Sequence, residues 1–221
     1  MSCKHAPVIT EIKPASPTHG KLRNNFNLKQ VIRAMEKGGA SGISILTEPK
    51  HFEGSLRSLM EARTYTELPI LMKDVIVDPI QVEAAFRVGA NAILLIFSVY
   101  ERNYAEYSIH EMIDLAHEVG LEVLLETHNK KQFLSALATD ADLVGINNRD
   151  LRTLNVDLKI TQKILSEVDN PNKIVVSESG IQNPTHIRFL YNCGAKAFLV
   201  GSAIMLADDV EAKVKELVMA I

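Results

Sequence analysis

The sequence predicts one (β/α)8 barrel, and three observations support that prediction. Short apolar, β-branched runs alternate along the chain with longer amphipathic segments. Eight such pairs fit into 221 residues, or about 28 residues per pair. The apolar runs are continuous, which is typical of parallel strands covered on both faces. Eight repeats without a linker or a switch point favour a closed barrel over an open doubly wound sheet, with an irregular α/β domain as the alternative.

The predicted strands follow one another at nearly even spacing. The first lies near residues 7–13, so we expect residues 1–221 to form a single barrel with no separate N-terminal lid domain. The eight strands are expected at 7–13, 42–46, 69–73, 92–96, 122–126, 143–146, 173–177 and 197–200.

A helix is predicted after each strand. Asp78-Pro79 and Asn183-Pro184 have the residue types of an N-cap followed by the first helical position. Glycines stand where four of the helices should end, at Gly38, Gly89, Gly120 and Gly194. The eight helices are expected at 28–37, 55–62, 79–88, 108–119, 130–137, 158–167, 184–192 and 208–218.

Composition excludes several classes of protein. The chain has 24 Lys+Arg and 27 Asp+Glu, a net charge of −3, which argues against a nucleic-acid partner. The longest apolar run, 92–97, is too short for a membrane span, and the first residues lack a secretory h-region. Two cysteines, Cys3 and Cys193, exclude a disulfide scaffold. We therefore expect a cytoplasmic protein without membrane or nucleic-acid partners, a monomer or weak homo-oligomer.

Charged side chains stand at the ends of the predicted strands. In a barrel of this class, catalytic groups come from the carboxyl ends of the strands. Glu11 and Lys13 are two residues apart and therefore share a face of their strand. Lys73 and Glu126 end alternate strands, which contribute to the same interior layers. Lysine beside carboxylate suits general acid–base chemistry, while a structural ion pair is the alternative interpretation.

Two glycine–serine pairs predict a phosphate site. Ser179-Gly180 follows the seventh strand, and Gly201-Ser202 follows the eighth. Phosphate sites in such barrels are commonly built there, with a short extra helix, for which residues 202–206 are available. Two ordinary turns are the alternative.

Motifs for metals and cofactors are not found. The histidines His110 and His117 are seven residues apart, whereas a helical zinc motif needs four. The glycines at 38–42 precede a strand instead of following one, so they do not form a dinucleotide fingerprint. The sequence predicts neither a metal nor a cofactor.

Seven motifs in one register resemble the indole-3-glycerol phosphate synthase family. The resemblance covers roughly residues 7–206, and implies a cofactor-independent enzyme of tryptophan biosynthesis. Such enzymes convert 1-(2-carboxyphenylamino)-1-deoxyribulose 5-phosphate into indole-3-glycerol phosphate, carbon dioxide and water. The matching segments are 11–20 (EIKPASPTHG), 44–48 (SILTE), 52–55 (FEGS), 69–74 (PILMKD), 145–151 (GINNRDL), 177–181 (SESGI) and 198–202 (FLVGS).

The resemblance also implies catalytic roles. Lys73 would protonate the substrate ketone as the aromatic carbon attacks it, and a desolvated lysine can donate in this way if its pKa falls. Glu126 would be the base of the later dehydration. Glu11 and Lys13 would orient ring closure, with Lys13 also pairing with the substrate carboxylate.

Binding roles follow from the same resemblance. Asn147 and Glu178 would hydrogen-bond polar groups of the substrate, with Arg149 near them, and Phe52 would contact the anthranilate ring. The phosphate group would be held by Ser16, Ser179, Gly180, Gly201 and Ser202.

The sequence departs from the family pattern in places. The first strand begins near residue 7, where family members usually carry an extension with a helix over the barrel mouth. Pro14 and Glu53 replace residue types that are more usual on the anthranilate side. The alternatives are another phosphate-binding barrel enzyme, such as a phosphoribosylanthranilate isomerase, and a non-catalytic phosphometabolite-binding barrel. That isomerase normally has a cysteine at the end of its first strand, whereas this strand ends in Glu11-Ile12-Lys13.

Overall fold

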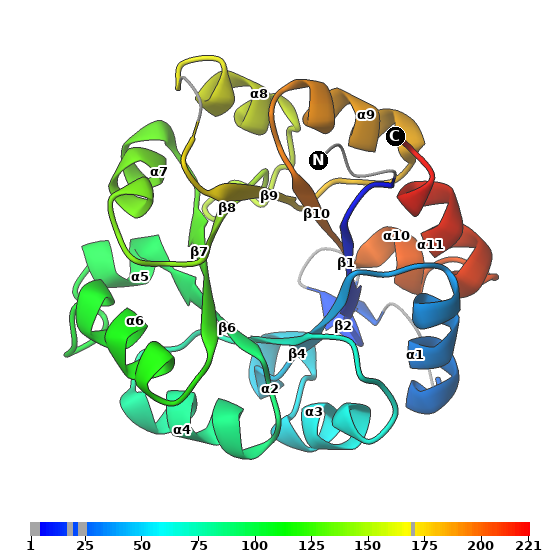
Figure 1. Ribbon diagram of the computed structural model, residues 1–221, viewed down its shortest axis with the longest axis horizontal. Helices are drawn as coiled ribbons and strands as arrows, with labels where there is room; N and C mark the ends of the chain where they lie inside the picture. The colour runs from blue at the N-terminus through cyan, green and yellow to red at the C-terminus, as the bar shows by residue number, and fades with distance from the viewer. Residues whose placement is uncertain (1–4, 17–19, 22–25, 169–170) are drawn as a thin grey trace.

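Eight parallel strands close into a barrel, which confirms the predicted fold class (Figure 1). The structure is a computed structural model and describes residues 5–16, 20–21, 26–168 and 171–221. The ring runs in the order β1-β10-β9-β8-β7-β6-β5-β4 and closes through the parallel pairing of β1 with β4. The strands are β1 Val8–Ile12, β4 Gly42–Leu46, β5 Ile70–Lys73, β6 Ala92–Ile96, β7 Glu122–Thr127, β8 Leu143–Asn147, β9 Ile174–Glu178 and β10 Ala197–Val200.

Eight helices surround this ring, each within two residues of its predicted bounds. Seven of them connect consecutive strands and α11 follows the last strand, and they pack their apolar faces against the outside of the barrel (Figure 1). These helices are α1 Leu28–Lys37, α3 Leu56–Arg63, α4 Pro79–Arg87, α6 Ile109–Glu118, α7 Lys130–Leu137, α8 Lys159–Leu165, α9 Pro184–Asn192 and α11 Val210–Val218.

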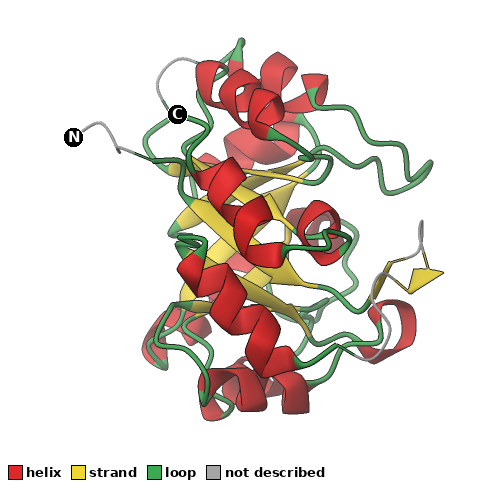
Figure 2. Cartoon of the chain, turned by 90° about the vertical axis from the view of Figure 1, so that its right-hand side faces the viewer, coloured by secondary structure: helices red, strands yellow, loops and turns green. Residues whose placement is uncertain are grey.

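Five short elements complete the fold. Helix α10 Ser202–Met205 is the extra helix expected after the eighth strand, whereas α2 Pro49–Phe52 and α5 Phe97–Glu101 were not predicted. The hairpin of β2 Ala15–Ser16 and β3 Gly20–Lys21 was also not predicted. Figure 2 places this hairpin at one end of the barrel and the C-terminus at the other.

Helix starts follow the capping chemistry of the sequence. The Asp78 side chain accepts a hydrogen bond from the Ile80 N–H, and Asn183 accepts one from the His186 N–H. Each of these helices has proline at its first position, where a missing N–H costs nothing. These confirmed caps fix where α4 and α9 begin, and hence where the loops over the barrel mouth end.

Apolar side chains fill the lower part of the barrel interior. Ile9, Leu71, Leu124 and Val176 lie on alternate strands and belong to this inner cluster. Two residues further along the same four strands stand Glu11, Lys73, Glu126 and Glu178. Because side chains two apart share a face, these four charged groups form the next layer above an apolar floor.

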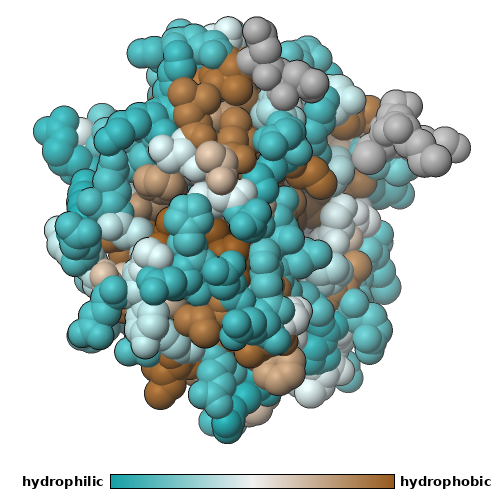
Figure 3. Space-filling model, turned by 60° about the vertical axis from the view of Figure 1, so that its left-hand side comes forward, coloured by the Kyte–Doolittle hydropathy of each residue, from teal (hydrophilic) through white to brown (hydrophobic). Residues whose placement is uncertain are grey.

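A second and larger core lies between the strands and the helices. It includes Phe133 of α7 and Phe198 of β10, both fully buried. Figure 3 shows one outer face of the molecule, where hydrophilic residues dominate and apolar ones form separate patches. No helix among the described residues is long and apolar enough to cross a membrane.

Burial should decide the cost of removing a phenylalanine ring from the helical layer. We expect Phe133→Ala to lower the free energy of unfolding by about 3–5 kcal/mol, because it leaves a cavity in the core. Phe86→Ala is the control, since this ring on α4 is 55% exposed, and should cost less than about 1 kcal/mol. Urea unfolding followed by circular dichroism measures both, and equal losses would contradict the packing described.

Candidate active site

A cavity of about 1340 Å³ opens at the carboxyl ends of the barrel strands. Every strand of the ring contributes to its wall, and charged and apolar side chains both face it. The strand residues include Glu11, Leu46, Lys73, Ile96, Glu126, Asn147, Glu178 and Leu199. All six catalytic residues predicted from the sequence line this cavity, together with Phe52, Arg149 and the two glycine–serine pairs.

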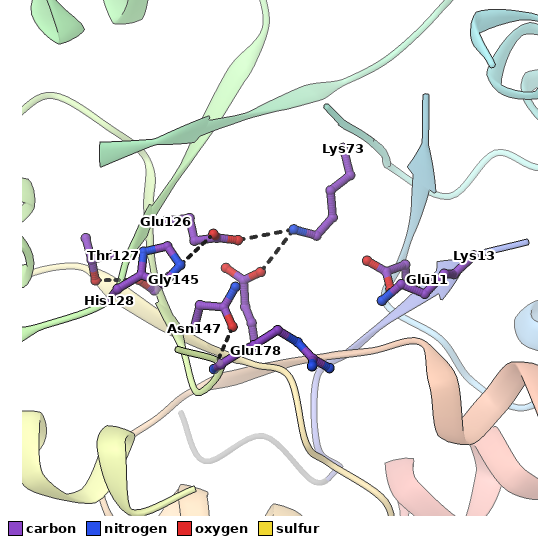
Figure 4. Close-up of polar contacts among 10 residues, drawn as sticks. Glu11, Lys13, Lys73, Glu126, Thr127, His128, Gly145, Asn147 and Glu178 are labelled. Atoms are coloured by element: carbon purple, nitrogen blue, oxygen red, sulfur yellow. Dashed lines mark hydrogen bonds and ion pairs between the residues drawn. The ribbon is translucent and has the colours of Figure 1, made fainter. Parts of the chain in front are cut away.

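Lys73 points its ammonium group toward two neighbouring buried glutamates (Figure 4). Its Nζ is 3.2 Å from Oε2 of Glu126 and 3.5 Å from Oε2 of Glu178. The three residues end β5, β7 and β9, which are alternate strands of the ring. The predicted neighbourhood of Lys73 and Glu126 is therefore confirmed, and Glu178 joins the same cluster.

A second ion pair lies beside the first. Lys13 Nζ is 2.9 Å from Oε2 of Glu11, and the Glu11 side chain is buried. The layer of four charged residues and Lys13 together contain two lysines and three glutamates, so full ionisation of all five side chains would leave one negative charge in excess.

Glycines make room for two of these carboxylates. A Cβ on Gly145 of β8 would collide with Oε1 of Glu178, and a Cβ on Gly201 would collide with Oε2 of Glu11. Gly145 lies on β8, which pairs with β9, the strand of Glu178. Gly201 directly follows β10, which pairs with β1, the strand of Glu11. A methyl group at either position would force the carboxylate out of its place.

The charges of the cluster set its protonation. Burial alone would lower the pKa of Lys73, but Glu126, Glu178 and Glu11 outweigh burial and raise it above its ordinary value. The fall in pKa that would help this lysine to donate its proton is therefore not found, because three acidic side chains act against burial. Burial would raise the pKa of Glu126, yet the charge of Lys73 and the contact with His128 hold it well below its ordinary range.

Glu178 behaves in the opposite way. Burial is the largest effect and raises its pKa to about 8, and the charges of Glu126 and Glu11 add to this against the attraction of Lys73. Neither carboxyl oxygen of Glu178 has a hydrogen-bond partner among the described residues. At neutral pH the cluster therefore contains a charged lysine, a charged Glu126 and a neutral Glu178 that faces the cavity.

The predicted phosphate-binding residues come together on one side of the cavity. Ser179 has φ 66° and Gly180 has φ 83°, so the chain turns through two left-handed residues directly after β9. Gly201 and Ser202 follow the neighbouring strand β10 and line the same cavity. The side chain of Ser16 lies outside the described part of the structure.

A buried amide holds the turn after β9 in place. The Asn148 side chain donates hydrogen bonds to Ser177 Oγ and to the carbonyl oxygens of Glu178 and Ser179, at 2.9–3.2 Å. Its Oδ1 accepts from the Thr161 N–H and hydroxyl at the start of α8. This network fixes the left-handed conformation of Ser179, which a non-glycine residue adopts only where the surroundings support it.

Loops supply the rest of the wall. Phe52 ends α2, and Arg149 lines the cavity while its Nη1 donates to the Leu154 carbonyl at 2.9 Å. Several apolar residues of the loops and of α5, to which the sequence assigns no site role, also face the cavity. They are Val75, Val99, Tyr104, Leu151, Leu154, Val156 and Leu206.

His128 is a further residue that the sequence analysis left without a role. Its Nε2 lies 3.2 Å from Oε1 of Glu126, and its side chain is largely buried. The available signal was the spacing of two in Glu126-Thr127-His128, which places both side chains on one face of the strand end.

Comparison with known families agrees with this geometry. The model of the family described as indole-3-glycerol phosphate synthase matches residues 2–217. The chain belongs to this family. An indole-3-glycerol phosphate synthase of Methanocaldococcus jannaschii is 43% identical over 215 residues, covering 96% of this chain and 78% of that protein. The indole-3-glycerol phosphate synthase of Methanopyrus kandleri is 43% identical over 216 residues, covering 96% and 83%.

Solved structures outside the indole-3-glycerol phosphate synthase family share the fold. A thiamine phosphate pyrophosphorylase from Pyrococcus furiosus superposes with a TM-score of 0.67 at 21% identity, covering 97% of this chain and 94% of that one. This likeness supports the barrel and nothing more specific.

The raised pKa of Glu178 predicts a dependence of stability on pH. Between its ordinary pKa of about 4.3 and about 8, the folded chain keeps a proton that the unfolded chain releases. The unfolding free energy of the wild type should therefore fall with rising pH, by at most about 1.4 kcal/mol per pH unit. Glu178→Gln removes this term, so its stability relative to wild type should increase from pH 5 to pH 8.

Urea unfolding at several pH values measures this difference. Glu106→Gln, a change of an exposed glutamate, is the control and should follow the wild-type pH dependence. Parallel curves for wild type and Glu178→Gln would contradict a neutral Glu178 in the folded protein.

Proposed function

We propose that this member of the family converts 1-(2-carboxyphenylamino)-1-deoxyribulose 5-phosphate into indole-3-glycerol phosphate, carbon dioxide and water. Family membership supports the reaction, which is that of a decarboxylating carbon–carbon lyase. The observation that carries the proposal is the contact of Lys73 with Glu126 at the cavity wall, at 3.2 Å. It places a proton donor and a proton acceptor side by side, as the chemistry requires.

The first step closes the five-membered ring. The aromatic carbon that carries the carboxylate attacks the ketone carbon, and the ketone oxygen takes a proton from Nζ of Lys73. The raised pKa of Lys73 keeps this donor protonated at neutral pH. For transfer, the ketone oxygen would take the place of Glu126 Oε2 beside Nζ, so binding of the substrate has to separate the ion pair.

Decarboxylation and dehydration complete the reaction. The carbon–carbon bond to the carboxylate breaks, carbon dioxide leaves, and the electron pair restores the aromatic ring. The new hydroxyl group then leaves as water after protonation, and a base removes a proton from the neighbouring carbon. Glu126 is suited to this step because its lowered pKa keeps it ionised.

The remaining polar groups bind and orient the substrate. Lys13 is placed to pair with the substrate carboxylate, and Glu11 holds Lys13 at 2.9 Å. Asn147 and the neutral Glu178 offer hydrogen bonds at the cavity wall, with Arg149 near them. Phe52 and the apolar loop residues suit the anthranilate ring.

The phosphate group is assigned to the turns after β9 and β10. Ser179, Gly180, Gly201 and Ser202 all line the cavity there, and Ser16 remains part of the proposal. The proposal includes a monomer or weak homo-oligomer as the active form, acting in the cytoplasm.

Removal of the Lys73 ammonium group should abolish most turnover. We expect Lys73→Met to lower kcat by about 10²–10⁴-fold, because it removes the general acid. Product formation from the carboxyphenylamino-deoxyribulose phosphate is followed by indole fluorescence. Lys215→Met, on the exposed face of α11, is the control. A folded wild-type protein without turnover would contradict the reaction, and an active Lys73→Met would contradict the role of Lys73.

A methyl group in the phosphate-binding turn should weaken substrate binding. Gly180 has φ 83°, and a Cβ there would collide with Val156. We expect Gly180→Ala to raise KM, and the inhibition constant of inorganic phosphate, about tenfold or more. Gly120→Ala is a matched control, since Gly120 also has φ 83° but its Cβ would meet open space. Equal constants for wild type and Gly180→Ala would place the phosphate group elsewhere.

A further inference from the structure

His128 contacts the proposed base on the side opposite Lys73 (Figure 4). Lys73 Nζ lies 3.2 Å from Oε2 of Glu126, and His128 Nε2 lies 3.2 Å from Oε1. Each carboxylate oxygen of Glu126 therefore has a nitrogen neighbour from a different residue. The His128 ring does not belong to the cavity wall, so it reaches the substrate only through Glu126.

We propose that His128 is a positioning residue that holds the Glu126 carboxylate through an uncharged Nε2–H during catalysis. This inference rests on the proposed function, in which Lys73 turns toward the substrate ketone. Once Lys73 leaves Oε2, His128 and the Asn147 side chain are the neighbours that still fix the orientation of the carboxylate. Oε2 is then free to accept the proton released in the dehydration.

The surroundings of the ring favour the tautomer with the proton on Nε2. Among the described residues, neither ring nitrogen has a partner at full hydrogen-bond geometry; Nε2 has its 3.2 Å ion-pair contact with Oε1 of Glu126, and Nδ1 has no partner. A buried N–H without a partner is costly, so a doubly protonated ring would leave Nδ1–H unsatisfied. A neutral ring with Nε2–H facing Oε1 avoids this cost.

The backbone under His128 is firmly attached. Its N–H donates to Oε1 of Gln132 at 3.0 Å, and Nε2 of Gln132 donates to Oε2 of Glu101 at 2.8 Å. The next residue, Asn129, caps helix α7 by accepting a hydrogen bond from the Gln132 N–H. The histidine thus stands between a strand end and a capped helix, on a fixed support for positioning another side chain.

Three variants test this role by steady-state kinetics. His128→Leu removes the ring nitrogens, His128→Gln offers an uncharged N–H donor in place of Nε2–H, and His117→Leu is the matched control. His117 also pairs with a carboxylate, Asp142 at 3.0 Å, but on the partly exposed outer side of α6. We expect His128→Leu to lower kcat about 10–100-fold with KM within about threefold. His128→Gln should recover most of the loss, and His117→Leu should match the wild type.

Two results with the His128 variants would overturn the inference. One is an unchanged kcat in His128→Leu. The other is a folded His128→Gln variant as slow as His128→Leu, since that would show that an uncharged donor is not what Glu126 needs. A turnover defect that appears equally in His117→Leu would assign the effect to general destabilisation and would also contradict the proposal. No turnover by the wild type would instead overturn the proposed function.

A spectroscopic measurement addresses His128 without turnover. Long-range ¹H–¹⁵N correlation spectra of protein labelled with ¹⁵N-histidine report which ring nitrogen carries the proton. The His128 signals are identified by their loss in His128→Gln. We expect protonated Nε2 and unprotonated Nδ1 at neutral pH, with a changed Nε2 shift in Glu126→Gln. A proton on Nδ1 alone, or signals unaffected by Glu126→Gln, would overturn the inference.

Discussion

The ammonium group of Lys73 lies among three buried glutamates, and the upper half of the barrel interior depends on it. A carboxylate without a partner in such a place would cost several kcal/mol. Nζ of Lys73 stands 3.2 Å from Glu126 and 3.5 Å from Glu178, and the charge of Glu11 also acts on it. With Lys13 paired to Glu11, two cations face three carboxyl groups, and the raised pKa of Glu178 removes the excess negative charge. One neutral acid, one charged base and one charged donor result from this balance.

The barrel provides the space and the surroundings for that cluster. Below it lie apolar side chains such as Leu124 and Val176, which keep the floor of the site dry and strengthen the interaction between the charges. Beside it, Gly145 and Gly201 leave room for the carboxylates of Glu178 and Glu11. These two glycines are thus required for close packing against charged groups.

The sequence predicts the regular part of this molecule well. All eight strands and the eight long helices lie within two residues of their expected bounds. The reason is that continuous apolar runs and amphipathic segments alternate regularly along the chain. Lys73 and Glu126 could be paired in advance, since alternate strands share interior layers.

What the sequence could not predict depends on the three-dimensional surroundings. The direction of the pKa shift of Lys73 reverses because Glu178 and Glu11 also reach it, and no spacing along the chain reveals that distance. Short helices α2 and α5, the hairpin β2–β3 and the apolar loop residues of the cavity have no periodicity to read. His128 stands two residues from Glu126, but only the structure shows its Nε2 beside the carboxylate.

The protonation of the cluster is the claim on which the mechanism rests, and infrared difference spectroscopy tests it most directly. Spectra of wild type and Glu178→Gln at pH 7 are compared in the carbonyl region. We expect the variant to lose the band of a protonated carboxylic acid, because Glu178 is neutral beside a charged Lys73 and a charged Glu126. Loss of a carboxylate band instead would show that Glu178 is ionised and would contradict this protonation of the cluster.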